Sequence, residues 1–207
     1  MNSKKKLLAG AGLFILIFFA ASAAYQKFAG SSAPNLLQAE NAAEGTGQEK
    51  ETVPAFDFTV QDPDGNPVQF SSLLGEKPVI LNFWSSKCPP CRQEMPDFEA
   101  AYQKWGDAVH FVMVDSIGAL GETEEMGRKW IEDQGFTFPV YYDTEQDAMG
   151  AYGVTRFPSS YFIDAAGNIT AVAQGMLNAE NLQKGIDMIT SSGPAGESGS
   201  PESGREG

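Results

Sequence analysis

The chain reads VILNFWSSKCPPCRQE from Val79 to Glu94. Its first six residues are nearly all apolar, which is typical of a short β-strand buried on both faces. From the second cysteine onward, apolar residues recur at steps of four and three, which predicts a helix buried along one side. These residues are Cys91, Met95, Phe98, Tyr102 and Trp105. The stretch therefore places Cys88 between the end of a buried strand and the start of a helix.

The position of Cys88 at a helix start favours thiol chemistry. A helix N-terminus carries about half a positive charge and unpaired N–H groups, which together lower the pKa of a thiol there. We therefore interpret Cys88 as an exposed nucleophile and Cys91, one turn into the helix, as the buried resolving thiol. Pro89 and Pro90 fit the first helical turn, where a missing N–H costs nothing.

The cysteine count narrows the alternatives. The chain has 2 cysteines and 1 histidine, whereas a structural zinc site needs four ligands. We therefore expect neither a metal nor a cofactor. A disulfide-rich secreted domain is excluded for the same reason. Two buried structural thiols are a further alternative, but a strand, a CxxC motif and a helix in that order favour redox chemistry.

The segments around this stretch alternate between strand and helix patterns. Phe56, Phe58 and Val60 alternate with polar residues, and Asp64-Gly65 marks a turn before a returning strand at 68–70. Further along we expect strands at 109–114, 140–142, 160–163 and 169–173, and helices at 122–134, from Asp143 or Thr144 to 152, and at 180–189 behind an Asn178 cap. This order predicts an α/β domain over residues 53–190, with a mixed central sheet flanked by helices and an added N-terminal hairpin.

Both ends of the chain differ in composition from this domain. Lys4–Lys6 precede an uncharged run from Leu7 to Ala24, which as a helix of ~1.5 Å per residue is just long enough to cross a bilayer. The lysines predict that residues 1–24 anchor the chain in the plasma membrane as a single span, with the domain on the extracytoplasmic side. A signal peptide cleaved after Ala21-Ser22-Ala23, followed by secretion, is the alternative. We expect residues 25–52 to be a flexible linker and residues 191–207 a disordered tail.

The charge of the chain excludes one class of partner. Lys and Arg total 14 against 27 Asp and Glu, which gives a net charge of −13. Such a chain repels phosphate backbones, so we expect no nucleic-acid partner.

Two separate motifs resemble the thioredoxin superfamily and, within it, the membrane-tethered thioredoxin-like reductases of bacteria, the TlpA and ResA group. In that group the first motif reads Trp-x-x-Trp-Cys-x-Pro-Cys with a Glu three residues on, and here it reads WSSKCPPCRQE at 84–94. The second is a cis-proline loop, which GVTRFPSSYFID at 153–164 matches in spacing. Pro96 matches the kink in the family's first helix. The likeness runs from Val53 to about Ile189 and implies a thioredoxin-like fold.

The resemblance implies roles for several residues. Pro158 would be cis and face the two cysteines, and the backbone before it, Phe157 included, would pair with a substrate strand. Glu94 would exchange a proton with the thiols, and an exposed helix carboxylate is the alternative. Trp84 would border the substrate site or pack in the core.

The sequence departs from the family pattern at a few positions. Lys87 replaces a Trp before the first cysteine, where a cation would lower the pKa of the thiol or point into solvent. Pro89 fills the variable position between the cysteines, and we expect both residues to border the substrate site. Asn82 stands where cytoplasmic thioredoxins carry a buried Asp, which leaves proton transfer to the Glu after the motif. Ser159-Ser160 replaces a pair of threonines.

The resemblance implies an extracytoplasmic thiol–disulfide oxidoreductase that reduces disulfides of exported proteins, apocytochrome c among them. A membrane electron donor would re-reduce it. The same CxxC motif in a redox-sensing or Cu(I)-handling module is the alternative, although related copper carriers use CxxxC with a distant His. A peroxidase of the superfamily is disfavoured, because Ser85 and Leu81 stand where such enzymes need Thr and Pro.

Overall fold

The computed structural model describes residues 37–38 and 52–191. Its strands are β1 (Leu37–Gln38), β2 (Val53–Pro54), β3 (Thr59–Gln61), β4 (Pro67–Gln69), β5 (Val79–Trp84), β6 (His110–Asp115), β7 (Val140–Tyr142), β8 (Ser159–Ile163) and β9 (Asn168–Gln174). Its α-helices are α2 (Pro89–Trp105), α3 (Glu124–Gln134), α4 (Asp147–Tyr152) and α5 (Ala179–Thr190), and its 3₁₀ turns are η1 (Phe70–Leu73) and η2 (Ala119–Gly121).

These strands form one mixed sheet, in the order β1-β9-β8-β5-β6-β7-β3-β4, with β2 also paired to β9. The β5–β6 and β6–β7 pairs are parallel, and β5–β8 and β8–β9 are antiparallel. The predicted α/β, thioredoxin-like fold with a mixed sheet and an N-terminal β3–β4 hairpin is therefore confirmed.

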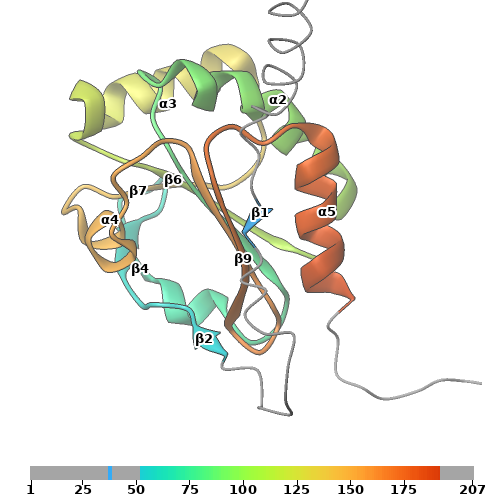
Figure 1. Cartoon of the computed structure of the whole chain (residues 1–207). Coiled ribbons are helices and arrows are strands. Elements are labelled where there is room, and N and C mark those ends of the chain that lie inside the picture. The colour runs from blue at the N-terminus through green and yellow to red at the C-terminus, as the bar shows by residue number, and fades with distance from the viewer. Residues whose placement is uncertain (1–36, 39–51, 192–207) are drawn as a thin grey trace, which may run out of the picture. The chain divides into compact units, whose positions relative to one another are not determined.

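The alternation of side chains along β5 joins two cores. Ile80 and Trp84 pack with α2, α3 and α5 on one face of the sheet, whereas Leu81 and Phe83 pack with α4 and η1 on the other. Figure 1 shows α2, α3 and α5 gathered on one side of the strands. All six residues of β5 are buried, as the apolar run predicts. The strand therefore holds the start of α2 at a fixed position above the sheet.

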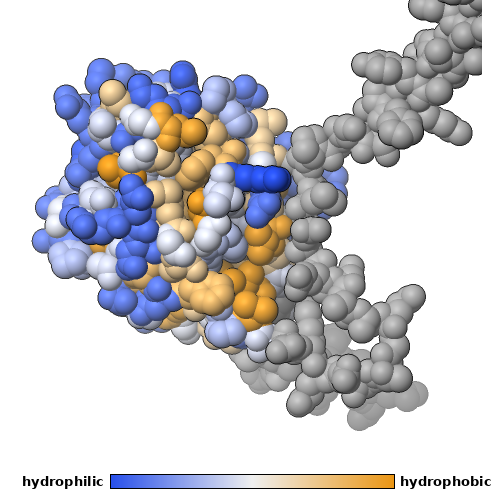
Figure 2. Space-filling model, turned by 60° about the vertical axis from the view of Figure 1, so that its left-hand side comes forward, coloured by the Kyte–Doolittle hydropathy of each residue, from blue (hydrophilic) through white to orange (hydrophobic). Residues whose placement is uncertain are grey.

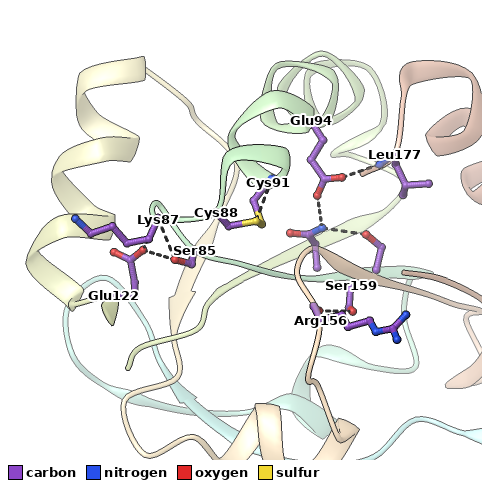
Figure 3. The surroundings of a disulfide bond; sticks show 11 residues. Ser85, Lys87, Cys88, Cys91, Glu94, Glu122, Arg156, Ser159 and Leu177 are labelled. Atoms are coloured by element: carbon purple, nitrogen blue, oxygen red, sulfur yellow. Dashed lines mark hydrogen bonds between the residues drawn. A yellow bond between two sulfur atoms is a disulfide. The ribbon is translucent and has the colours of Figure 1, made fainter. Parts of the chain in front are cut away.

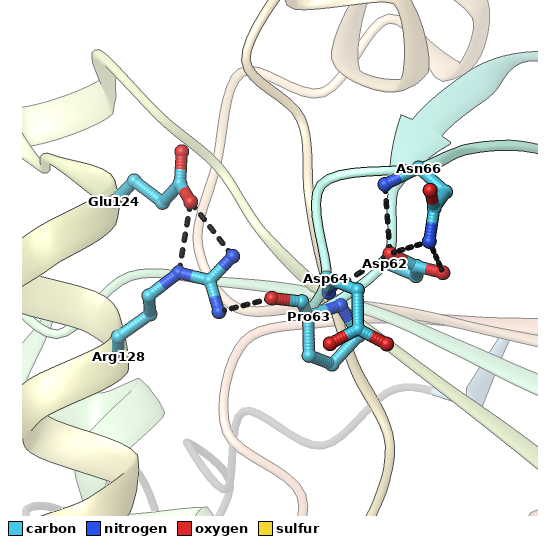
Figure 4. A network of polar contacts seen from close by, with 6 residues as sticks. All are labelled: Asp62, Pro63, Asp64, Asn66, Glu124 and Arg128. Atoms are coloured by element: carbon cyan, nitrogen blue, oxygen red, sulfur yellow. Dashed lines mark hydrogen bonds and ion pairs between the residues drawn. The ribbon is translucent and has the colours of Figure 1, made fainter.

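The β3–β4 hairpin is tied to α3 by a small polar network (Figure 4). Asp62 accepts hydrogen bonds from the backbone N–H groups of Asp64 and Asn66 at 2.9 and 2.8 Å, which closes the turn. Arg128 of α3 donates to the carbonyl of Pro63 at 2.8 Å and pairs with Glu124. The network fixes α3 relative to the hairpin.

Several expected boundaries were wrong. Phe56 precedes β3 and is 49% exposed, and its ring rests edge-on against Tyr152 in place of joining the buried row. Glu122 lies outside α3 because Thr123 accepts from the N–H of Met126 and so caps the helix. Asp143 does accept from the N–H groups of Ala148 and Met149, although α4 begins only at Asp147.

The surface of the described part is mostly hydrophilic. Figure 2 shows one face with hydrophobic residues gathered across its middle and hydrophilic residues around them. The large apolar side chains that are exposed are Val53, Phe56, Leu120 and Met126.

The predicted anchor and tail, residues 1–24 and 191–207, lie outside the described residues except for Ser191. In the expected linker, Leu37–Gln38 pairs with β9, and nearly all the rest is likewise outside the described part. Within residues 37–38 and 52–191, the helices are too short or too polar to span a bilayer.

Candidate active site

The two cysteines form a disulfide at the start of α2. Cys88 is the N-cap of the helix, and its sulfur accepts a hydrogen bond from the N–H of Cys91 at 3.2 Å (Figure 3). Cys91 is fully buried, as expected, but Cys88 is only 2% exposed, which corrects the prediction of an exposed sulfur. The bond to Cys91 turns the Cys88 sulfur back onto the first turn of α2. We expect the same N–H to stabilise a Cys88 thiolate when the disulfide is reduced.

The turn before Cys88 is held by a buried carboxylate that the sequence analysis missed. Glu122, 2% exposed, accepts from the hydroxyl of Ser85 at 2.6 Å and the hydroxyl of Ser86 at 2.8 Å. It also accepts from the N–H of Lys87 at 3.1 Å. Polar groups buried in this turn need acceptors, but no sequence pattern indicates that the acceptor comes from the loop after β6. Glu122 therefore fixes the backbone that presents the first sulfur.

Glu94 lies behind the disulfide, one turn after Cys91, and is fully buried. One of its oxygens accepts from the side-chain amide of Asn82 at 2.9 Å, and the other accepts from the N–H of Leu177 at 2.8 Å. Asn82 also donates to the hydroxyl of Ser160 at 2.9 Å. The alternative of an exposed helix carboxylate is thus wrong.

Burial raises the pKa of Glu94 to about 8, against the lowering effect of these two hydrogen bonds, and the charge of Asp97 adds to the rise. Glu94 is therefore mostly protonated at neutral pH. Its pKa lies close to the ~8.5 of an ordinary thiol. A proton can pass between such groups in either direction at little cost in free energy.

The loop opposite α2 carries the expected cis peptide bond, between Phe157 and Pro158. Phe157 packs against the core that contains both cysteines, and Pro158 is buried. In the described part of the chain, the N–H groups of Arg156 and Phe157 and the carbonyl of Phe157 make no hydrogen bond. These groups are available to pair with an extended peptide.

The sequence profile described as the AhpC/TSA family matches residues 52–172. The chain belongs to this thioredoxin-like family. It is 33% identical over 137 residues to a thiol-disulfide oxidoreductase ResA from Bacillus thuringiensis, covering 66% of this chain and 76% of the relative. It is 29% identical to the thioredoxin-like protein YneN from Bacillus subtilis, over 89% of this chain and 98% of that protein. The crystal structure of StoA from Bacillus subtilis superposes with a TM-score of 0.55 at 28% identity, covering 66% of this chain and 99% of StoA.

The chain is thus a thiol-disulfide oxidoreductase of the ResA and StoA type, with the Cys88–Cys91 disulfide as its redox pair. In this oxidoreductase Trp84 is fully buried against Trp130, at 5.6 Å between ring centroids. The expectation that Trp84 contacts substrate is therefore wrong, because β5 turns this side chain under α3. The alternative prediction, that Trp84 packs in the core, is confirmed.

The other two residues expected to border the substrate site are exposed. Figure 3 shows the Lys87 side chain pointing away from the disulfide, so the alternative of a solvated cation fits. Pro89 lies on the surface, at a groove of about 290 Å³ that it lines with Arg92, Gln93, Trp130 and Gln134. The groove therefore lies between the first turns of α2, which begins at the residue after Cys88, and α3.

A second buried acid, also missed, ends β6 beside Trp84. Asp115 is fully buried, and neither of its carboxyl oxygens has a hydrogen-bond partner among the described residues. Burial raises its pKa to about 9, and the charges of Glu122 and Glu124 contribute. Gly127 of α3 lies directly over this carboxyl, and a Cβ there would collide with it. Asp115 is thus protonated at neutral pH.

Proposed function

We propose that this oxidoreductase is an extracytoplasmic reductase of disulfides in exported proteins. Cys88 is the nucleophile, Cys91 the resolving thiol and Glu94 the proton carrier. The observation that carries the proposal is the placement of the redox pair at the N-terminus of α2 with a buried, protonated Glu94 one turn behind it.

The reaction follows from this placement. The Cys88 thiolate attacks one sulfur of a substrate disulfide, the substrate S–S bond breaks, and the released substrate thiolate takes up a proton. The ionised form of Glu94, the minor one at neutral pH because its pKa is about 8, then takes the proton of Cys91, and the Cys91 thiolate attacks the Cys88 sulfur. This step closes the Cys88–Cys91 disulfide and releases the second substrate thiolate, which takes up a proton from water, so two electrons pass from enzyme to substrate.

The free backbone groups at Arg156 and Phe157 support a binding mode for the substrate. An extended segment that pairs with them lies along the cis-Pro158 loop. The substrate segment's own sequence then decides which disulfide it brings to Cys88. In this proposal Pro158 and Phe157 position the substrate, and Lys87 and Pro89 border it.

Location and electron supply are part of the proposal. The Lys4–Lys6 and Leu7–Ala24 segments support a single-span anchor with the domain outside the plasma membrane. The electrons come from a membrane donor, and the clients include apocytochrome c. A disulfide reductase needs such a supply in an oxidising compartment, where disulfides otherwise persist.

The in vivo redox state tests this direction of electron flow. Cells making the full chain are quenched in acid and labelled with a maleimide that adds mass. Labelling of intact cells with an impermeant maleimide reports the location. The reductase predicts a mostly reduced Cys88–Cys91 pair that the impermeant reagent reaches. A mostly oxidised pair indicates an oxidase, and protection from the reagent excludes the extracytoplasmic site. An N-terminus near Ala24 on the isolated protein favours secretion over an anchor.

A further inference from the structure

The cations of the described domain divide into two groups. Arg128, Lys129 and Lys184 form ion pairs within their own helices, and Lys104 donates to Gln183 and lies over Trp105. The side chains of the remaining cations make neither an ion pair nor a hydrogen bond with any described residue, and these cations are Lys77, Lys87, Arg92 and Arg156.

Three of these cations belong to the segments that carry the redox pair and the cis-Pro158 loop. Lys87 directly precedes Cys88, and Arg92 directly follows Cys91. Arg156 lies two residues before Pro158, on the loop whose Phe157 packs against the core of the cysteines. All three cationic side chains are exposed. We call Lys87, Arg92 and Arg156 the cationic rim.

No described acid forms an ion pair with the cationic rim. Glu94 and Glu122 are buried, and their oxygens accept hydrogen bonds from inside the fold. Glu124 at the start of α3 is paired with Arg128. A chain with a net charge of −13 thus carries unpaired, exposed cations on the segments that form its active site.

One cation of the rim lines the groove beside Pro89. The groove, about 290 Å³, is lined by Pro89 and Trp130 as well as the cation Arg92. The Arg92 guanidinium lies 5.8 Å from the Trp130 ring centroid, on the α3 side of the redox pair. A substrate segment that reaches from the Phe157 backbone past Cys88 therefore starts beside Arg156 and ends at the groove that Arg92 lines.

We infer that this active site selects disulfides flanked by acidic side chains, so that its substrate class is an exported protein with Asp or Glu beside the reducible cysteines. The inference rests on the proposed reductase function and adds the recognition chemistry of that site. Positive charge at the rim attracts such a segment and repels one with lysines, and salt weakens both effects, because the Debye length falls to ~10 Å at 0.1 M.

Two matched peptides test the inference. Each has one internal disulfide, with two Asp beside it in the first peptide and two Lys in the second. Bis(2-hydroxyethyl) disulfide is the neutral reference. The full chain is pre-reduced, and its oxidation by each substrate is followed by thiol labelling. We expect the Asp peptide to react about tenfold faster than the Lys peptide at low salt, since each exposed charge pair contributes about two- to fivefold. High salt should reduce the ratio several-fold.

Charge reversal locates the effect. Arg156→Glu and Arg92→Glu should each lower the Asp-to-Lys rate ratio several-fold. The ratio within one variant cancels any change in thiol reactivity. Lys77→Glu is the matched control, since Lys77 is also unpaired but precedes β5, about 20 Å from the Cys88 end at ~3.3 Å per residue. It should leave the ratio unchanged. The glutamine variants should give about half the effect of the reversals.

Three results overturn the inference. Equal rates for the two peptides at low salt would show that the site has no charge selectivity. If Lys77→Glu lowers the rate ratio as much as Arg156→Glu does, the cationic rim is not the source of the selectivity. A wild-type protein that reduces the neutral disulfide but shows no peptide preference refutes only the recognition chemistry. One that reduces none of the three substrates refutes the proposed reductase and this inference with it.

Discussion

Replacing Glu94 with Gln removes the ionisable group behind the disulfide and keeps its shape. The two Glu94 oxygens accept from Asn82 and from the N–H of Leu177. In Glu94→Gln the remaining oxygen can still accept from Leu177. If the side-chain amide of Asn82 flips, so that its oxygen and nitrogen exchange places, its oxygen can accept from the amide of the introduced glutamine and from the Ser160 hydroxyl. The variant should therefore fold.

The magnitude follows from linkage. The pKa of Glu94 is about 8 in the folded state, above its unfolded value, so the folded protein holds this proton more tightly. Ionising the group costs stability as the pH rises from the unfolded pKa towards the folded one. From values of 4.5 and about 8, wild type loses about 2–3 kcal/mol from this group between about pH 6 and about pH 9. The Gln variant loses none of it.

Chemical denaturation of the oxidised proteins at these two pH values measures the difference. Glu94→Gln should gain stability relative to wild type as the pH rises, and its reduced form should turn over disulfides about 10²-fold more slowly because the proton carrier is gone. An offset between the two proteins that does not change with pH means that Glu94 ionises at its ordinary pKa. Unchanged turnover removes its role in proton transfer.

Other predictions concern the supports of the site. Gly127→Ala should destabilise the protein by about 1–3 kcal/mol, because the new methyl collides with Asp115, and an added Asp115→Ala should recover part of the loss in thermal unfolding. Glu122→Ala should cost about 2–4 kcal/mol, since it leaves the Ser85 and Ser86 hydroxyls and the Lys87 N–H without their acceptor. It should also speed hydrogen exchange at Lys87, and an unchanged exchange rate would show that Glu122 does not hold the turn. Asn178→Ala should cost about 1 kcal/mol by removing the cap of α5, whose Asn181 N–H it binds at 2.9 Å; a loss of less than a few tenths would contradict the cap.

Periodicity and spacing predicted most of the fold because they record which face of each element is buried. The run at 79–84 and the helix from Cys91 follow from such patterns, as does the Asn178 cap of α5. Phe56 failed because its partner, Tyr152, comes from a helix far along the chain. The alternation of apolar and polar residues does not distinguish a core residue from an aromatic residue that makes its contact at the surface.

The site was predictable where a motif carried it and not where a long-range contact did. The CxxC pair and the cis-Pro158 loop were indicated by motifs that lie 70 residues apart between Cys88 and Pro158. Glu122 and Asp115 are single acids in a chain that holds 27 Asp and Glu, and only the fold buries them. Cys88 is buried because its sulfur bonds to Cys91 and accepts from the Cys91 N–H, and residue spacing does not reveal how deeply this places the sulfur.

The division of labour between the two cysteines is the central claim, and trapping a mixed disulfide tests it most directly. Cys88→Ser and Cys91→Ser variants of the full chain are each incubated with a disulfide-bonded substrate, then quenched in acid and analysed by intact-mass spectrometry. Cys91→Ser should accumulate a covalent adduct through Cys88, because the resolving thiol is gone, and Cys88→Ser should form little or none, because Cys91 lies inside the first turn of α2 whereas Cys88 caps the helix. Adducts of equal yield on both variants, or an adduct only through Cys91, would contradict the account.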